Sequence, residues 1–531
     1  MWPQNYAPVA GSVGASAAVA AVPVAVLLYM LGVRRKPAWA AALAALAAAA
    51  AVALFVYRMP VATLASAIGY GAAFGLFPIA WIVFNAILLY RITVETGRFE
   101  VLKDSIGGLT SDRRLQALLI AFSFGAFLEG AAGFGSPVAV AAAMLAGLGF
   151  PPFYAAAICL LANTAPVAFG SIGIPVITLA RVTELPVGEL SAAVGRICAP
   201  VSLIVPAYLV GVMGGRKALR AVLPAVAVCG ISFASVQFLV SNFVGPQLTD
   251  ILSALAAIAS LVVLLLFWKP KDAAGAPPAG RRRRAPEVLL AWTPYALLVV
   301  FVLLWGWQPV RAVLERTSVV FPWPGLHNQV ARVAPVVDGI KPYAATYTFN
   351  WLAASGTACL LAALASALVL RMRPRQLAAA VRSTAKQLAS PILTIATVLA
   401  LAFLMNYSGA TGTLGRAFSE TGRLFPFFGA LLGWMGVFLT GSDTSSNALF
   451  GPLQVIAANR LGFSPVLMAA ANSAGGVMGK MISLQSIAVA CAAAGLPRTD
   501  EARLFRFTLR HSLVLASVIG LIAMLYAHIG L

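Results

Sequence analysis

The chain has 531 residues, of which 61% are hydrophobic and 10% are charged. Soluble domains carry roughly 25% charged residues, so this composition excludes a soluble enzyme or binding domain and indicates an integral membrane protein. The formal net charge is +21, but the basic residues cluster beside apolar runs, a pattern that orients membrane spans and does not indicate nucleic-acid binding.

Apolar runs of about 20 residues, long enough to cross a bilayer as a helix, occur along the whole chain. The clearest runs are 12–32, 37–57, 62–90, 191–213, 217–240, 248–268, 288–305, 346–370 and 510–530. They lack the alternation of a membrane β-barrel, so we predict an all-α polytopic membrane protein with about 11 to 14 helices. Basic clusters after the first span and after the third predict cytoplasmic loops and an outside amino terminus.

The segment GAFLEGAAGFGSP begins at Gly125 and places Glu129 in a stretch of apolar residues and glycines. The flanking apolar segments, 116–129 and 136–150, are short and favour a re-entrant hairpin over two full spans. Downstream, NTAPVAFGSIGIP begins at Asn163 and contains the prolines and glycines of a broken helix. Irregular backbone at membrane depth is tolerated only where it lines protein or a cavity, so we predict that 116–180 forms part of a site.

The segment KPKDAAGAPPAGRRRRAPE begins at Lys269 and combines proline, glycine, alanine and charge. This composition predicts a cytoplasmic linker over 269–287. The linker divides the chain into a first half, 1–268, and a second half, 288–531.

The second half repeats the unusual features of the first. The first match begins at Gly436, where GVFLTGSDTSSN has the same spacing of glycines and apolar residues as the first motif and contains Asp443. The second match begins at Ala471, where ANSAGGVMG corresponds to ANTAPVAFG in the first half. We predict a second hairpin and broken helix over 425–495, with the break at NSAGG. The spans that precede the two units run in opposite directions, so we predict inverted repeats, which are typical of secondary transporters.

Three ionisable residues are predicted at membrane depth in these units: Glu129, Asp443 and Lys480. Such residues are costly in a membrane and mark transport pathways. Glu129 and Asp443 are candidate proton-coupling residues, because partial desolvation favours a protonated carboxyl group. The structural alternative for each is a helix cap or a partner of a buried base. Lys480 is predicted either to bind a substrate carboxylate or to neutralise one of the acids.

Short polar side chains complete the predicted substrate site. They are Asn163, Thr164, Ser445, Asn472 and Ser473. Half-helix amino termini favour anions, so these residues together predict a cradle for a small carboxylate, although each alone is also compatible with packing. The five cysteines and three histidines show no metal-binding or nucleophile pattern, so we predict neither a metal site nor an enzyme.

Four stretches resemble the signature sequences of the L-lactate permease family of bacterial inner-membrane carriers. They are GAFLEGAAGFGSPVAVAAAMLAGLGFPP, LLANTAPVAFGSIGIP, GSDTSSNALFGPLQ and ANSAGGVMGKMISLQSIAVA. The resemblance covers essentially the whole chain. It implies symport of L-lactate, D-lactate or glycolate with protons, driven by the proton motive force without a cofactor, and an ion-transporter-like fold in which a transport domain moves against a scaffold. The family pattern leads us to expect proline at position 484. This chain has Leu484 there instead.

The residues alone leave three other functions open. A sodium-coupled carboxylate carrier is the nearest, because unwound carbonyls and Ser, Thr and Asn side chains also suit sodium. An intramembrane enzyme would need a catalytic pair or a metal, and the two acids have no histidine or nucleophile motif beside them. A passive channel is disfavoured by the repeated hairpins. A homo-oligomer is left open.

Overall fold

The protein is a bundle of membrane-length helices. The structure, a computed structural model, describes residues 1–133, 136–270, 283–337 and 339–530. Within these ranges 12 helices are long and apolar enough to span a membrane, or up to 13 if one bent pair is counted as a span. The predicted all-α polytopic fold and the predicted helix number are therefore confirmed. The linker predicted over 269–287 lies largely outside the described residues, and the division into halves stays a prediction.

The amino-terminal helices form a first layer. In chain order they are α1 (Val13–Ala20), α2 (Val22–Leu28), α3 (Ala38–Ala51), α4 (Val61–Phe74), α5 (Trp81–Glu95) and α6 (Arg98–Gly107), with π-helical segments η1 (Tyr29–Val33), η2 (Val52–Val56) and η3 (Gly75–Ala80). The pair α4 and α5 forms one long span through η3. Alanine and glycine faces let these helices pack closely: a Cβ atom at Gly71 would lie 2.6 Å from the carbonyl oxygen of Leu399 in α18.

The first predicted unit consists of a helical hairpin and a broken helix. Its elements are α7 (Arg113–Gln116), η4 (Ala117–Phe124), α8 (Gly125–Ala131), α9 (Ser136–Gly147), α10 (Pro152–Ala162), the 3-10 segment η5 (Val167–Phe169) and α11 (Gly170–Thr183). The segment from α7 to α8 and helix α9 correspond to the two predicted hairpin arms, and the re-entrant character of the hairpin stays a prediction.

The middle of the chain contributes long helices and two small sheets. The helices are α12 (Val187–Ala221), α13 (Leu223–Phe243), α14 (Thr249–Phe267), α15 (Ala285–Gly306), α16 (Gln308–Glu315), α17 (Ser355–Val369) and α18 (Pro374–Ser408). The strands are β1 (Trp2–Pro3), β2 (Val319–Pro322), β3 (Val330–Arg332), β4 (Lys341–Pro342) and β5 (Thr346–Phe349). Strand β3 pairs in parallel with β1 and antiparallel with β4, and β2 pairs antiparallel with β5.

The second predicted unit occupies the carboxy-terminal part. Its elements are α19 (Ala410–Phe418), the 3-10 segment η6 (Ser419–Leu424), α20 (Phe425–Thr440), α21 (Asp443–Leu461), α22 (Pro465–Lys480), α23 (Leu484–Ala494), the 3-10 segment η7 (Arg498–Asp500) and α24 (Glu501–Ile529). The helices α3, α4, α5, α15, α17 and α18 pack as one group, and α20 to α24 pack with α10 and α12 as another.

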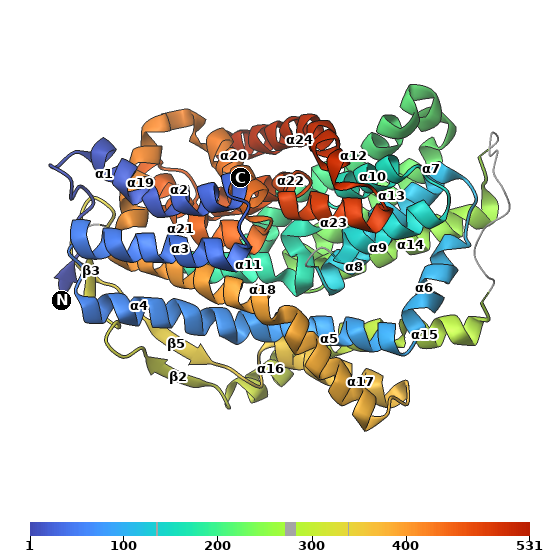
Figure 1. Cartoon of the computed structure of the whole chain (residues 1–531), viewed down its shortest axis with the longest axis horizontal. Helices are drawn as coiled ribbons and strands as arrows, with labels where there is room; N and C mark the ends of the chain where they lie inside the picture. Colours follow the sequence, from blue (N-terminus) through green and yellow to red (C-terminus); the bar gives the residue numbers. More distant parts are fainter. Residues whose placement is uncertain (134–135, 271–282, 338, 531) are drawn as a thin grey trace.

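The two ends of the bundle carry the segments that the charge pattern assigns to opposite membrane sides. Strand β1 holds the amino terminus against β3 at one end, whereas Arg283 before α15 forms an ion pair of 2.6 Å with Asp104 of α6 at the other (Figure 1). The first hairpin approaches the α6 end, where Gly147 and Asp104 line the same groove. In the second unit, Gly412 of α19 packs on Tyr6 at the opposite end. The sidedness and the inverted repeat stay predictions.

Candidate functional site

The helix break predicted at Asn163 is confirmed. Helix α10 ends at Ala162, and the chain bends by 63° between α10 and the segment Val167–Thr183. At the start of α11, Ser171, Ile172 and Gly173 have φ angles of 48°, 61° and 73°. Two of these are not glycine, and such residues rarely adopt the left-handed region outside functional or otherwise constrained segments. A Cβ atom at Gly173 would lie 2.7 Å from the backbone of Pro246, so this position also requires glycine for space.

Glu129 lies beside this break and is almost completely buried, with 4% of its surface exposed. It belongs to the last turn of α8. Its Oε1 atom faces Gly170, where a Cβ atom would lie only 2.8 Å away. Its Oε2 atom has no hydrogen-bond partner among the described residues.

Asn163 is the nearest predicted substrate residue to Glu129. Its side chain faces the carboxyl group, is 4% exposed, and leaves both amide atoms without a hydrogen-bond partner in the described part of the chain. Buried polar atoms normally find a partner. Glu129 and Asn163 together therefore form a polar pocket whose hydrogen-bonding capacity the described side chains do not satisfy.

Asp443 begins α21 and is also buried, with 3% of its surface exposed. The Ser442 side chain caps the helix by accepting a hydrogen bond from the Ser445 amide, so the predicted cap role of Asp443 is wrong. The Asp443 Oδ2 atom instead accepts hydrogen bonds from Ser473 Oγ at 2.7 Å and from Asn447 Nδ2 at 3.3 Å. Its Oδ1 atom has no partner among the described residues.

Asn447 connects Asp443 to both units. Its Nδ2 atom lies 3.0 Å from Ser473 Oγ and 3.2 Å from the carbonyl oxygen of Pro175 in α11. Its Oδ1 atom accepts a hydrogen bond from Asn472 Nδ2 at 2.9 Å. Sequence reasoning missed Asn447 as a functional residue, although its position one helical turn after Asp443 places the two side chains on one face.

Lys480 lies between the two acids. It ends α22, and its ammonium group donates a hydrogen bond to the carbonyl oxygen of Gly441 at 2.8 Å. It is within electrostatic range of both Glu129 and Asp443, yet it forms no ion pair within 4.0 Å in the described ranges. The three ionisable groups therefore lie in one region of the molecule, and their roles stay predictions.

The remaining predicted residues separate into two classes. Asn472 and Ser473 belong to the hydrogen-bond network of Asp443 and Asn447. Thr164 is buried, but its hydroxyl donates to the Leu161 carbonyl of its own helix. Ser445 is buried beside the start of α21 and contributes its backbone amide to the helix cap. The structure thus favours Asn472 and Ser473 over Thr164 as members of the site.

The helix break predicted at NSAGG is wrong. Helix α22 continues through Asn472 to Lys480, and the break follows at residues 481–483. The glycines of this segment serve helix packing: a Cβ atom at Gly475 would lie 2.0 Å from the Ala430 carbonyl oxygen, and one at Gly433 would lie 1.9 Å from that of Asn472. Close approach of α20 and α22 therefore explains them. Leu484, where the family pattern suggests proline, begins α23, so the short break after α22 forms without it.

Asp250 is a further buried acid that sequence reasoning missed. It lies in the first turn of α14, is 1% exposed, and has no hydrogen-bond partner for either carboxyl oxygen among the described residues. Its Cβ atom packs on Gly130, the residue after Glu129. The sequence gives only a weak signal, because an aspartate at the start of an apolar run resembles an ordinary helix-end residue.

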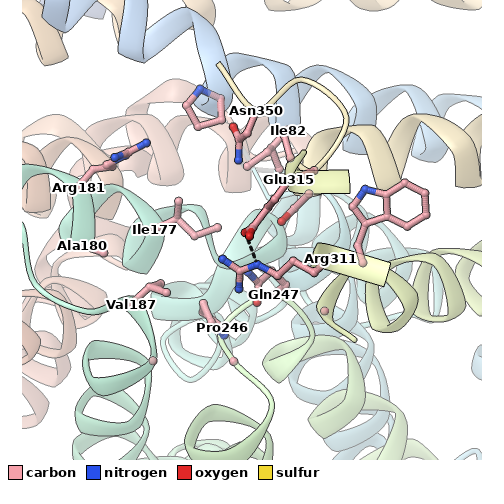
Figure 2. Close-up of a pocket in the computed structure, with 18 of the residues that line it drawn as sticks. Ile82, Ile177, Ala180, Arg181, Val187, Pro246, Gln247, Arg311, Glu315 and Asn350 are labelled. Carbon is pink, nitrogen blue, oxygen red and sulfur yellow. Dashed lines mark hydrogen bonds and ion pairs between the residues drawn. The ribbon is translucent and has the colours of Figure 1, made fainter. Parts of the chain in front are cut away.

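A cavity of about 1330 Å³ lies at the β-strand end of the molecule, between α11, the segment before α14, α15 and α16. Figure 2 shows Gln247 and Pro246 facing Arg311 and Glu315 across it. Arg311 and Glu315 form an ion pair of 2.7 Å, and Arg181 stacks on the ring of Phe74, 5.2 Å from its centre. The cavity therefore combines aromatic walls with charged groups and leads toward the break in α11.

These groups can bind and release small charged species. One bent helix pair, two buried acids with unsatisfied oxygens and one lysine lie at or beside the starts of α11, α21 and α23. Helix amino termini and a lysine attract an anion, and buried carboxylates without a cation beside them take up protons. The arrangement fits coupled binding of an anion and a proton.

Comparison with known proteins gives a consistent result. A family model described as L-lactate permease matches residues 16–530. The L-lactate permease of Escherichia coli (strain K12) is 45% identical over an alignment of 545 positions, which covers 100% of this chain and 98% of the relative. The glycolate permease GlcA of the same strain is 44% identical, and the alignment covers 99% of this chain and 98% of the relative. Among solved structures, the YdaH transporter of Alcanivorax borkumensis shares 16% identity over 87% of each chain, with a TM-score of 0.45.

Proposed function

The chain belongs to the L-lactate permease family, and we propose that it is a secondary active transporter that moves L-lactate together with protons. It is a multi-pass transporter of the bacterial inner membrane, not an enzyme. The names of the relatives, L-lactate permease and glycolate permease, support a small 2-hydroxy monocarboxylate as substrate. We include D-lactate and glycolate in the proposal for this reason.

The position of Lys480 carries the proposal. Its ammonium group has one hydrogen bond, to the Gly441 carbonyl, and lies within electrostatic range of two carboxyl groups without contacting either. A monocarboxylate needs one cation, and a dicarboxylate would favour two. Lys480 is the partly buried cation that our proposal assigns to the substrate carboxylate.

The charges of the site explain why an anion and a proton would bind together. Lys480, Glu129 and Asp443 carry one positive and two negative formal charges when all are ionised. A monocarboxylate adds one negative charge at membrane depth, where an unbalanced charge is costly. A proton that binds to one of the carboxylates balances this added negative charge. Joint binding thus leaves the net charge unchanged, which is the electrostatic basis of coupling in this proposal.

Glu129 is our main proton-coupling residue and Asp443 is the second. Asp443 accepts two hydrogen bonds through Oδ2, so described donors stabilise its carboxylate form. Glu129 Oε2 accepts none. An ionised carboxylate without donors is the less stable of the two in a buried site, so Glu129 is the better residue to bind and release a proton during transport.

The substrate hydroxyl and carboxylate also need hydrogen-bonding groups. Asn163 offers two unsatisfied amide atoms beside Glu129, and Asn472, Ser473 and Ser445 line the Asp443 side. We propose that the two units deliver these groups from opposite membrane sides, as inverted repeats do in secondary transporters. Movement of the broken helices then exposes the site to each side in turn.

Uptake of labelled L-lactate into proteoliposomes with an imposed inward proton gradient tests the proposal. We expect accumulation that depends on the pH difference, does not need sodium, and is competed by D-lactate and glycolate but not by a dicarboxylate. Accumulation that follows a sodium gradient and ignores the pH difference would replace proton coupling with sodium coupling. Release of preloaded lactate without countertransport would indicate a channel.

A further inference from the structure

Asp250 occupies an unusual position for an acidic residue. It is 1% exposed, and neither carboxyl oxygen has a hydrogen-bond partner within the described residues. A carboxylate in that setting loses its hydration without replacement donors, which is strongly unfavourable. The packing therefore favours the protonated form of the Asp250 carboxyl group, or a carboxylate with a ligand bound to it.

The same packing brings Asp250 to the coupling residue of the proposed function. The Asp250 Cβ atom contacts Gly130, where a side-chain carbon would lie only 2.8 Å away. Gly130 follows Glu129 in α8, and the two carboxyl groups are within electrostatic range of each other. Together with Asn163, Glu129 and Asp250 form a buried cluster in which every member has a polar atom without a described partner.

The remaining elements packed against α14 bring few titratable groups to Asp250. Cys198 of α12 is in electrostatic range, and it is a buried thiol. Helix α13 carries Cys229, whose sulfur is 3.7 Å from the Ser123 hydroxyl, and η4 has no titratable side chain. Arg181 of α11 lies on the Phe74 ring at the cavity. Among the described residues, Asp250 therefore has a carboxyl neighbour and no cationic one.

The chain segment that forms the floor of the cavity ends two residues before Asp250. The cavity is lined by Gly245, Pro246, Gln247 and Leu248, and α14 begins at Thr249. Figure 2 shows Pro246 and Gln247 at this floor. The cavity is at the end of the molecule that the charge pattern assigns to the outside. Asp250 thus follows the cavity-lining segment in the chain and packs on the residue after Glu129.

We propose that Asp250 is a further proton-binding residue, which passes protons between the outer cavity and Glu129. In the inward step, the O–H bond of the Asp250 carboxylic acid breaks and an O–H bond forms on the Glu129 carboxylate. Asp250 then takes a new proton from hydronium in the cavity. Chains of acidic side chains within a membrane commonly relay protons in this way. The inference rests on the proposed function and adds the route by which its proton arrives.

Transport by the full-length protein in proteoliposomes tests the inference with Asp250→Asn, which keeps the size of the side chain and removes its acid. Ser253→Ala is the matched control, because Ser253 lies one turn further along α14, is fully buried, and bonds only to the Thr249 carbonyl. Two readouts are compared for each variant: L-lactate uptake driven by a pH gradient, and exchange of labelled for unlabelled L-lactate at equal pH, which needs no net proton movement.

We expect Asp250→Asn to lower gradient-driven uptake more than about tenfold while exchange stays within about twofold of the unsubstituted protein. Ser253→Ala should change neither readout. Unchanged gradient-driven uptake in Asp250→Asn would overturn the inference, and so would equal loss of both readouts in a protein of normal thermal stability, since that result indicates a structural role. Sodium-driven uptake that Asp250→Asn abolishes would also overturn it, by showing that the carboxyl pair binds sodium.

The outcome is separable from that of the proposed function. If the unsubstituted protein shows no pH-driven uptake, proton coupling itself is wrong and the relay is excluded with it. If the unsubstituted protein is proton-driven and Asp250→Asn behaves identically, the relay alone is wrong.

Discussion

The ammonium group of Lys480 donates a hydrogen bond to the backbone carbonyl of Gly441, with Nζ and O 2.8 Å apart. Lys480 ends α22 just before the second helix break, and Gly441 lies in the turn between α20 and α21 with a φ of 72°. One side chain therefore joins the hairpin turn to the broken helix. A substrate carboxylate that binds Lys480 would change the contact that holds these two elements together.

Replacement of Lys480 should weaken substrate binding. Lys480→Ala removes the proposed partner of the carboxylate, and a hydrogen bond to a charged group contributes about 1.5–3 kcal/mol, so we expect the KM for L-lactate to rise by roughly one to two orders of magnitude. Lys480→Arg keeps the charge and should retain part of the affinity. Initial uptake rates over a range of lactate concentrations measure both. An unchanged KM in Lys480→Ala would remove Lys480 from the substrate site.

Ser473 and Thr164 should differ, although sequence assigned both to the same cradle. Ser473→Ala removes the shorter of the two hydrogen bonds to Asp443 Oδ2, the one of 2.7 Å, at a cost of about 1.5–3 kcal/mol for a bond to a charged group, so uptake and thermal stability should both fall. Thr164→Val removes only a bond to the Leu161 carbonyl and should cost about 1 kcal/mol or less. Parallel melting curves and uptake assays make the comparison. Equal losses of uptake and thermal stability in the two variants would contradict the distinction between Ser473, in the hydrogen-bond network of Asp443, and Thr164 outside it.

Glycines between α20 and α22 should be intolerant of a methyl group. Gly433→Ala would place a carbon 1.9 Å from the Asn472 carbonyl oxygen, which forces the helices apart and should destabilise the protein by roughly 3 kcal/mol. Gly188→Ala is the matched control, because nothing lies within 4 Å of its Cβ position. Detergent-solubilised thermal stability reports the difference. A Gly433→Ala protein as stable as Gly188→Ala would contradict the close packing of this helix pair.

The predicted sidedness can be checked with single cysteines, since all five native cysteines are buried. Arg311→Cys at the cavity rim should react with a membrane-impermeant thiol reagent in intact cells. Lys103→Cys on α6, at the other end of the bundle, should react only after permeabilisation. The reverse labelling pattern would invert the topology that the basic clusters predict and would place the cavity on the cytoplasmic side.

Sequence reasoning found the groups whose chemistry conflicts with their surroundings. Glu129, Asp443 and Lys480 were identifiable because a charge in an apolar, glycine-rich segment has few structural explanations. The first break was identifiable because proline and adjacent glycines interrupt a helix whatever packs against it. Such signals are local, and the structure agrees with them.

Features that depend on a partner helix were not identifiable. A pair of glycines gives the same sequence signal whether it interrupts a helix or allows another helix to pack closely. The sequence therefore predicts a break at NSAGG, whereas in the structure this segment packs against α20. Asp250 resembled a helix-end residue because its burial comes from α8, which is more than a hundred residues away in the chain. Asn447 gained its importance from contacts with α11 and α22.

The most direct measurement of the central claim compares Glu129→Gln with the unsubstituted protein in pH-driven L-lactate uptake and in lactate exchange at equal pH. Glutamine keeps the shape of Glu129 against Gly170 and removes the proton-binding group. The account predicts that gradient-driven uptake falls more than about a hundredfold, while exchange persists and no longer varies with pH. Uptake in Glu129→Gln with the same rate and the same pH dependence as the unsubstituted protein would contradict it.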